Sequence, residues 1–117
     1  MNEKIVKLGQ WGCDVEGGLR RASGDENFYI ECLETIPDDE GFEILIKALG
    51  EKDISAAFDS SHTLKGLFAN LGLTPMLDKD NEIVEPLRRG NSEGLSEKLN
   101  ELLEMNDYLR SVLQSRG

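Results

Sequence analysis

Apolar residues recur at helical spacing along most of this chain, and this spacing constrains the fold more than any other feature. Between Asp53 and Gly72 the core candidates follow one another at alternating intervals of three and four residues, the stripe of a helix that packs against other helices. These candidates are Ile54, Ala57, Ser61, Leu64, Phe68 and Leu71. No segment shows the strict alternation typical of a strand. The sequence therefore predicts an all-α protein.

Start and stop signals divide the rest of the chain into further helices. A capping box, Ser23 to Glu26 with Ser23 as N-cap, predicts a helix that ends at Pro37 and buries Phe28 together with Tyr29. The other predicted helices are one capped by Asp38 or Asp39 and ending at Gly50, one starting at Thr74-Pro75 with Thr74 as N-cap, and one starting near Asn91-Ser92. Two weak helical turns precede them. The sequence contains no internal repeat or linker. We therefore interpret residues 1–117 as a single domain, an antiparallel helical bundle.

Charge excludes several classes of partner. Thirteen Lys and Arg against 23 Asp and Glu give a formal net charge of −10, so we expect neither nucleic acid nor an anionic membrane surface as a partner. No apolar run approaches the roughly 20 residues of a membrane span, and the first residues lack a signal-peptide pattern. Cys13 and Cys32 are predicted to be reduced thiols rather than a disulfide. We therefore expect a cytoplasmic protein.

The single histidine, His62, is predicted to point away from the core. At about 100° per residue, it lies roughly 120° from the middle of the apolar stripe. Neighbours on the same face are small or apolar to a degree unusual for a solvated surface. They are Phe58, Asp59, Lys65, Gly66, Ala69 and Leu73. A lone helical histidine is commonly a plain surface or packing residue, but this neighbourhood favours a docking surface around a reactive imidazole.

Two of these neighbours suggest the chemistry. Gly66 lies one turn after His62, where its missing side chain leaves the imidazole open to a bulky partner, at a cost of about 1 kcal/mol against Ala. Lys65 brings a mobile cation to the same place, where it would stabilise an anion such as a phosphoryl group.

The residues around His62 resemble the signature of histidine-containing phosphotransfer (HPt) domains. His62-Thr63-Leu64-Lys65-Gly66, followed by Asn70-Leu71-Gly72, is similar to the His-x-Leu-Lys-Gly…Leu-Gly motif of that family. The segment from Gly24 to Tyr29 looks like its Gly-Asp…Tyr helix start, and Arg88-Arg89-Gly90-Asn91 like its Arg-x-Gly-Asp turn. The resemblance is strongest over residues 15–115.

The resemblance implies an antiparallel four-helix bundle with additional short N-terminal helices, and a phosphorelay function. In such domains Nε2 of the histidine, here His62, accepts a phosphoryl group from the aspartyl phosphate of a receiver domain and passes it to another receiver. Lys65 would neutralise phosphoryl oxygens and Gly66 would permit close approach, with Phe58, Ala69 and Leu73 as further docking residues.

The same resemblance implies how the chain works with its partners. Those partners would be the receiver domains of response regulators and hybrid histidine kinases, with Mg²⁺ bound on the receiver and no metal or cofactor on this chain. The chain would be a monomer and a stoichiometric carrier without kinase activity. The group that orients Nδ1 of His62 stays open between Asp59, Asn81 and Glu82.

Two other functions compete with the phosphocarrier. The chain could be a non-catalytic helical interaction module that docks receivers or another protein without carrying phosphate. It could also be the dimerisation and phosphoacceptor domain of a sensor kinase, which is disfavoured because no ATP-binding domain follows within the 117 residues. The sequence contains no phosphate-binding loop motif and no set of Cys and His residues spaced to bind zinc.

Overall fold

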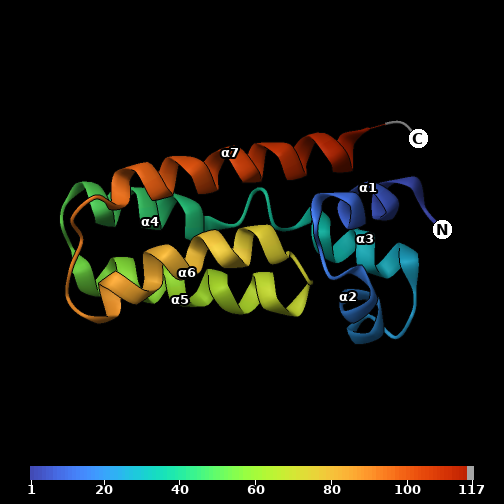
Figure 1. Cartoon of the computed structure of the whole chain (residues 1–117), viewed down its shortest axis with the longest axis horizontal. Coiled ribbons are helices and arrows are strands. Elements are labelled where there is room, and N and C mark those ends of the chain that lie inside the picture. The colour runs from blue at the N-terminus through green and yellow to red at the C-terminus, as the bar shows by residue number, and fades with distance from the viewer. Residues whose placement is uncertain (116–117) are drawn as a thin grey trace.

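The computed structural model describes residues 1–115, and all their regular secondary structure is helical. The helices are α1 (Glu3–Trp11), α2 (Val15–Arg21), α3 (Glu26–Glu34), α4 (Glu40–Gly50), α5 (Ile54–Asn70), α6 (Thr74–Arg88) and α7 (Leu95–Gln114). Figure 1 shows α4 to α7 side by side along the long axis, with α1 to α3 gathered at one end. Because α5 packs on α4 and α6, and α7 on α6 and α4, the last four helices form a bundle. The predicted all-α bundle with short N-terminal helices is confirmed.

Aspartate side chains start four of the helices. The carboxylates of Asp14, Asp25, Asp39 and Asp53 each accept a backbone N–H from the first turn that follows, which satisfies one of the donors left free at a helix start. The predicted cap at Ser23 is wrong, because this residue lies in the preceding turn with a φ of 58°.

Helix α6 also begins differently from the prediction. Its N-cap is Leu73 rather than Thr74, and Thr74 and Pro75 form its first turn. Helix α7 begins at Leu95, a few residues later than predicted, after Gly94 in the left-handed conformation.

The apolar stripe of α5 lies in the centre of the bundle. Ala57, Leu64 and Phe68 are fully buried, and Phe68 packs on Phe42 of α4 with ring centroids 6.1 Å apart. The prediction that Phe28 shares the buried side of α3 is wrong: Phe28 is 50% exposed, whereas Tyr29 beside it is fully buried.

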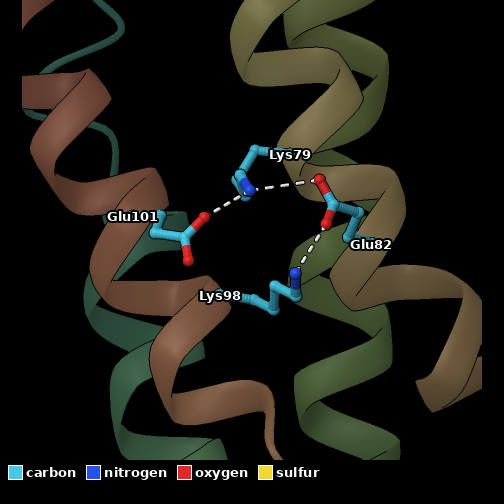
Figure 2. A network of polar contacts seen from close by, with 4 residues as sticks. All are labelled: Lys79, Glu82, Lys98 and Glu101. Atoms are coloured by element: carbon cyan, nitrogen blue, oxygen red, sulfur yellow. Dashed lines mark hydrogen bonds and ion pairs between the residues drawn. The ribbon is translucent and has the colours of Figure 1, made fainter.

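Ion pairs join α6 to α7 along the outside of the bundle. Figure 2 shows Lys79 and Glu82 of α6 beside Lys98 and Glu101 of α7. Lys79 Nζ contacts Glu101 and lies 3.1 Å from Glu82 Oε2, while Lys98 Nζ lies 2.8 Å from Glu82 Oε1. These contacts raise the pKa of Lys79, chiefly through Glu101, and lower that of Glu82, chiefly through Lys98. The carboxylate of Glu82 is therefore held by Lys79 of its own helix and by Lys98 of α7.

The N-terminal helices bind the C-terminal end of α5. Its last carbonyls and those just after it, at Ala69 to Gly72, each accept a hydrogen bond from α2, α3 or the loop before α2. The donors are Arg21 Nη2 to Ala69 at 2.9 Å, Arg21 Nε to Asn70 at 2.6 Å, the Tyr29 hydroxyl to Leu71 at 2.7 Å and the Asp14 amide to Gly72 at 2.8 Å. These donors add hydrogen bonds to carbonyls at a helix end, where partners from within the helix run out. Residues of α2, α3 and the loop before α2 therefore cap the C-terminal end of α5.

Further contacts seat the same helices on the bundle. Trp11 packs edge-on against Tyr108 of α7, with ring centroids 4.8 Å apart.

Cys13 and Cys32 are both free, and burial raises the pKa of the Cys13 thiol to about 12. In residues 1–115, no helix combines the length and the apolar character that crossing a membrane requires.

Candidate functional site

His62 lies on the exposed side of α5, as the helical geometry predicts. The residue before it, Ser61, is fully buried, so the boundary between the buried and the exposed surface of α5 runs between these two side chains, which are about 100° apart. Ser61 Oγ donates a 2.7 Å hydrogen bond to Oδ1 of Asp80, a fully buried residue of α6. This contact ties α5 to α6 at the residue next to His62.

An aromatic ring flanks His62 on the side toward the start of α5, and a guanidinium lies over that ring. The ring of Phe58, one turn earlier, lies 5.6 Å from the imidazole, centroid to centroid. Arg88 of α6 places its guanidinium carbon 5.0 Å from the centroid of the Phe58 ring, within the range of a cation–π interaction. Arg88 therefore brings a second cation into the surroundings of His62, from a different helix.

A carboxylate connects this guanidinium to Lys65. Glu85 Oε2 lies 3.3 Å from Arg88 Nε, and Glu85 Oε1 lies 3.9 Å from Lys65 Nζ. All three side chains are partly exposed. The histidine face of α5 and the adjoining edge of α6 thus carry two cations with one carboxylate between them.

Gly66 has no packing role inside the chain. A Cβ built there would meet nothing within 4 Å, whereas one at Gly18 would come within 2.6 Å of the Tyr29 ring. Gly18 is needed for internal packing, and Gly66 is not. The open space beside Gly66 is available to a partner that approaches His62.

The remaining predicted docking residues divide into two groups. Ala69 is exposed and Phe58 is partly exposed on α5. The prediction that Leu73 shares this face is wrong, because Leu73 is fully buried. Helix α5 ends at Asn70, and Gly72 has a φ of 71°. The rotation of 100° per residue that predicted the position of Leu73 therefore does not apply to it.

None of the three candidates for orienting Nδ1 hydrogen-bonds to the imidazole. Among the described residues, His62 makes no side-chain hydrogen bond at all. Glu82 is held by Lys79 and Lys98, and Asp59 is exposed. The Asn81 Oδ1 atom is buried and has no hydrogen-bond partner within residues 1–115.

An open groove of about 530 Å³ runs beside the histidine face, between α4 and α5. Ile44, Ala56 and Leu67 supply its apolar surface, and Asp59 belongs to its acidic lining. Ile44 is 45% exposed. The groove therefore provides partly apolar surface between α4 and α5, next to Asp59 of the histidine face.

Glu85 and Asp80 were not predicted to be part of this region, and Arg88 was predicted only as part of a turn motif. Asp80 and Glu85 stand in a charged stretch of α6 that looks like a solvated helix face. Only the packing of α6 on α5 distinguishes the buried carboxyl from the exposed one. For Arg88, its spacing of three residues from Glu85 was the available signal.

No group of three or more His, Cys, Asp or Glu side chains within residues 1–115 is arranged to hold a metal ion. The side chains near His62 are two cations, Lys65 and Arg88, two carboxylates, Asp59 and Glu85, and apolar groups. Lys65 and Arg88 can hydrogen-bond to an anionic group such as a phosphoryl group.

Fold and site together define a class: a helical bundle that presents one exposed histidine beside cationic side chains on a bundle helix. A scan against protein-family models matches the Hpt domain over residues 28–112. The chain belongs to the Hpt domain family, whose members are phosphotransfer domains of two-component signalling that interact with receiver domains. Neither a search of curated proteins nor a search of solved structures finds a match. The family match begins within α3, so α1 and α2 lie outside it.

Proposed function

We propose that this chain is a phosphorelay intermediate in which His62 carries the phosphoryl group. The observation that supports this most is the placement of His62: it is exposed on α5, inside the family match, with Lys65 and open space at Gly66 one turn away. The donor and the acceptor are receiver domains of response regulators or hybrid histidine kinases.

Transfer begins with Nε2 of the unprotonated imidazole, whose lone pair is free when Nδ1 carries the proton. This lone pair attacks the phosphorus of an aspartyl phosphate on the receiver. A P–N bond forms and the P–O bond to the aspartyl oxygen breaks, with its electron pair staying on the carboxylate. Passage to a second receiver reverses these steps. Phosphoryl transfer depends chiefly on positioning and on neutralising charge, and Lys65 supplies positive charge on the histidine face.

Docking would use the surface around His62. Phe58 and Ala69 contribute contact area on α5, and Gly66 lets the receiver backbone come close. The acidic lining of the α4–α5 groove favours a partner whose contact residues are basic. Mg²⁺ would be bound by the receiver, and the carrier would act as a cytoplasmic monomer that is phosphorylated stoichiometrically and has no kinase activity of its own.

The test is transfer from a phosphorylated receiver domain to the wild type and to His62→Gln. We expect an acid-labile, alkali-stable label on the wild type and none on the variant, with the same helical circular dichroism for both. Equal labelling of both proteins would show that His62 is not the acceptor. Binding of receivers without any label on the wild type would favour a non-catalytic docking module.

A further inference from the structure

Glu85 pairs with two cations, Lys65 on the histidine face of α5 and Arg88 on α6. Its two carboxylate oxygens are directed to different partners, Oε2 to Arg88 Nε at 3.3 Å and Oε1 to Lys65 Nζ at 3.9 Å. Lys65 comes from α5 and Arg88 from α6. One carboxylate therefore holds cations from two helices on the same side of the bundle.

Helix spacing relates Lys65 to His62, and the Phe58 ring relates Arg88 to it. Lys65 follows His62 by three residues on α5, which places the two side chains on the same face. Arg88 lies over the Phe58 ring, and that ring lies beside the imidazole. Glu85 thus balances the charge of the surface where a phosphoryl group on His62 would lie.

Stability does not explain this arrangement. The side chains of Lys65, Glu85 and Arg88 are 34%, 45% and 47% exposed, and ion pairs this exposed contribute little to folding. By contrast, a carboxylate close to a phosphoryl group has a direct electrostatic effect. A carboxylate in this place can hold neighbouring cations before transfer and would repel a dianion after it.

We propose that Glu85 is a positioning residue that holds Lys65 and Arg88 beside His62 in the unphosphorylated protein and gives them up to the phosphoryl group when that group arrives. This inference rests on the proposed function. Because the carboxylate stays close to phosphorylated His62, it makes the dianionic phosphoryl group less stable and so favours onward transfer. Without Glu85, Lys65 and Arg88 would stabilise the phosphoryl group without the opposing negative charge of this carboxylate.

The experiment labels the full chain with phosphoramidate, which needs no receiver: Nε2 displaces ammonia as the P–N bond of the reagent breaks and a new P–N bond forms. The phosphoryl pKa is then measured from the pH dependence of the ³¹P NMR shift. We expect Glu85→Gln to lower this pKa by about half a unit, the size of one charge at several ångströms in a solvated site, and Lys65→Gln to raise it.

Glu104→Gln on α7 is the matched control, since it removes the same charge from an exposed residue that forms no ion pair within residues 1–115. It should leave the phosphoryl pKa unchanged. An equal pKa in the wild type and Glu85→Gln would overturn the role of Glu85 while leaving His62 as the acceptor. Failure of phosphoramidate to label His62 in the wild type would overturn the proposed function, and the role of Glu85 with it.

Discussion

Ser61 Oγ donates a 2.7 Å hydrogen bond to Oδ1 of Asp80, so the residue next to His62 is tied to a carboxyl group that is fully buried in α6. The second oxygen, Oδ2, has no hydrogen-bond partner within residues 1–115. Burial raises the pKa of Asp80 to about 7, although the Ser61 hydrogen bond and the charge of Lys65 act in the opposite direction. A buried carboxyl with one free oxygen is better accommodated in its protonated form.

Asp80 should therefore make stability depend on pH. Its pKa is about 7 in the folded chain against an ordinary value of 3.8, so the folded state holds the proton more tightly. The resulting stabilisation is complete below about pH 4 and is lost as the pH rises through 7. Asp80→Asn still accepts from Ser61 but does not titrate. We expect the stability of Asp80→Asn relative to the wild type to rise by about 2 kcal/mol between pH 5 and pH 8, measured by urea unfolding. A constant difference across this range would contradict the assignment.

The Tyr29 hydroxyl should stabilise the end of α5. Tyr29→Phe leaves the Leu71 carbonyl without the donor that now lies 2.7 Å away in a buried position, and an unpaired buried acceptor costs about 1–3 kcal/mol. Thermal unfolding should show this loss. Tyr108→Phe is the control, because Tyr108 is 45% exposed and its hydroxyl bonds to none of the described residues. Equal effects of the two substitutions would show that the contact with α5 is unimportant.

Alanine substitutions at Gly66 and Gly18 should have opposite effects on stability. Both residues are inside helices, where Ala is favoured over Gly by about 1 kcal/mol. At Gly66 a Cβ meets nothing within 4 Å, so Gly66→Ala should be more stable than the wild type. At Gly18 the Cβ would come within 2.6 Å of the Tyr29 ring, so Gly18→Ala should be less stable. Chemical denaturation measures both.

A larger side chain at the same open position separates stability from docking. Gly66→Gln should fold normally but accept the phosphoryl group more slowly from a receiver, because the side chain occupies the approach to His62. An unchanged transfer rate would show that receivers do not use this space.

Leu73 and Ala69 should separate packing from docking in the same way. Leu73 is fully buried, so Leu73→Ala leaves a cavity that should cost about 2–5 kcal/mol of stability. Ala69 is exposed, so Ala69→Gln should leave the melting temperature within a few degrees of the wild type and weaken receiver binding. Calorimetry and a binding titration measure the two effects. Normal stability of Leu73→Ala would contradict its buried position.

The sequence alone determined the features that depend on a single helix. The spacing of apolar residues along α5 shows which side of that helix is buried, because side chains repeat every 3.6 residues whatever the helix packs against. The position of this apolar stripe therefore places His62 on the exposed side of α5 and Ser61 on the buried side, as the structure shows. The same local reasoning was wrong for Leu73, because it assumed that the helix continues past Asn70.

Only the tertiary structure decided which residues from different helices meet. Asp80 and Glu85 are both carboxylates of α6, yet one is buried against Ser61 and the other lies at the surface between Lys65 and Arg88. Their positions depend on how far α6 is shifted along α5 and how it is rotated, and packing across the whole bundle sets both quantities. Phe28 was misplaced for the same reason, since the short helix α3 contacts only part of the bundle and leaves this ring exposed.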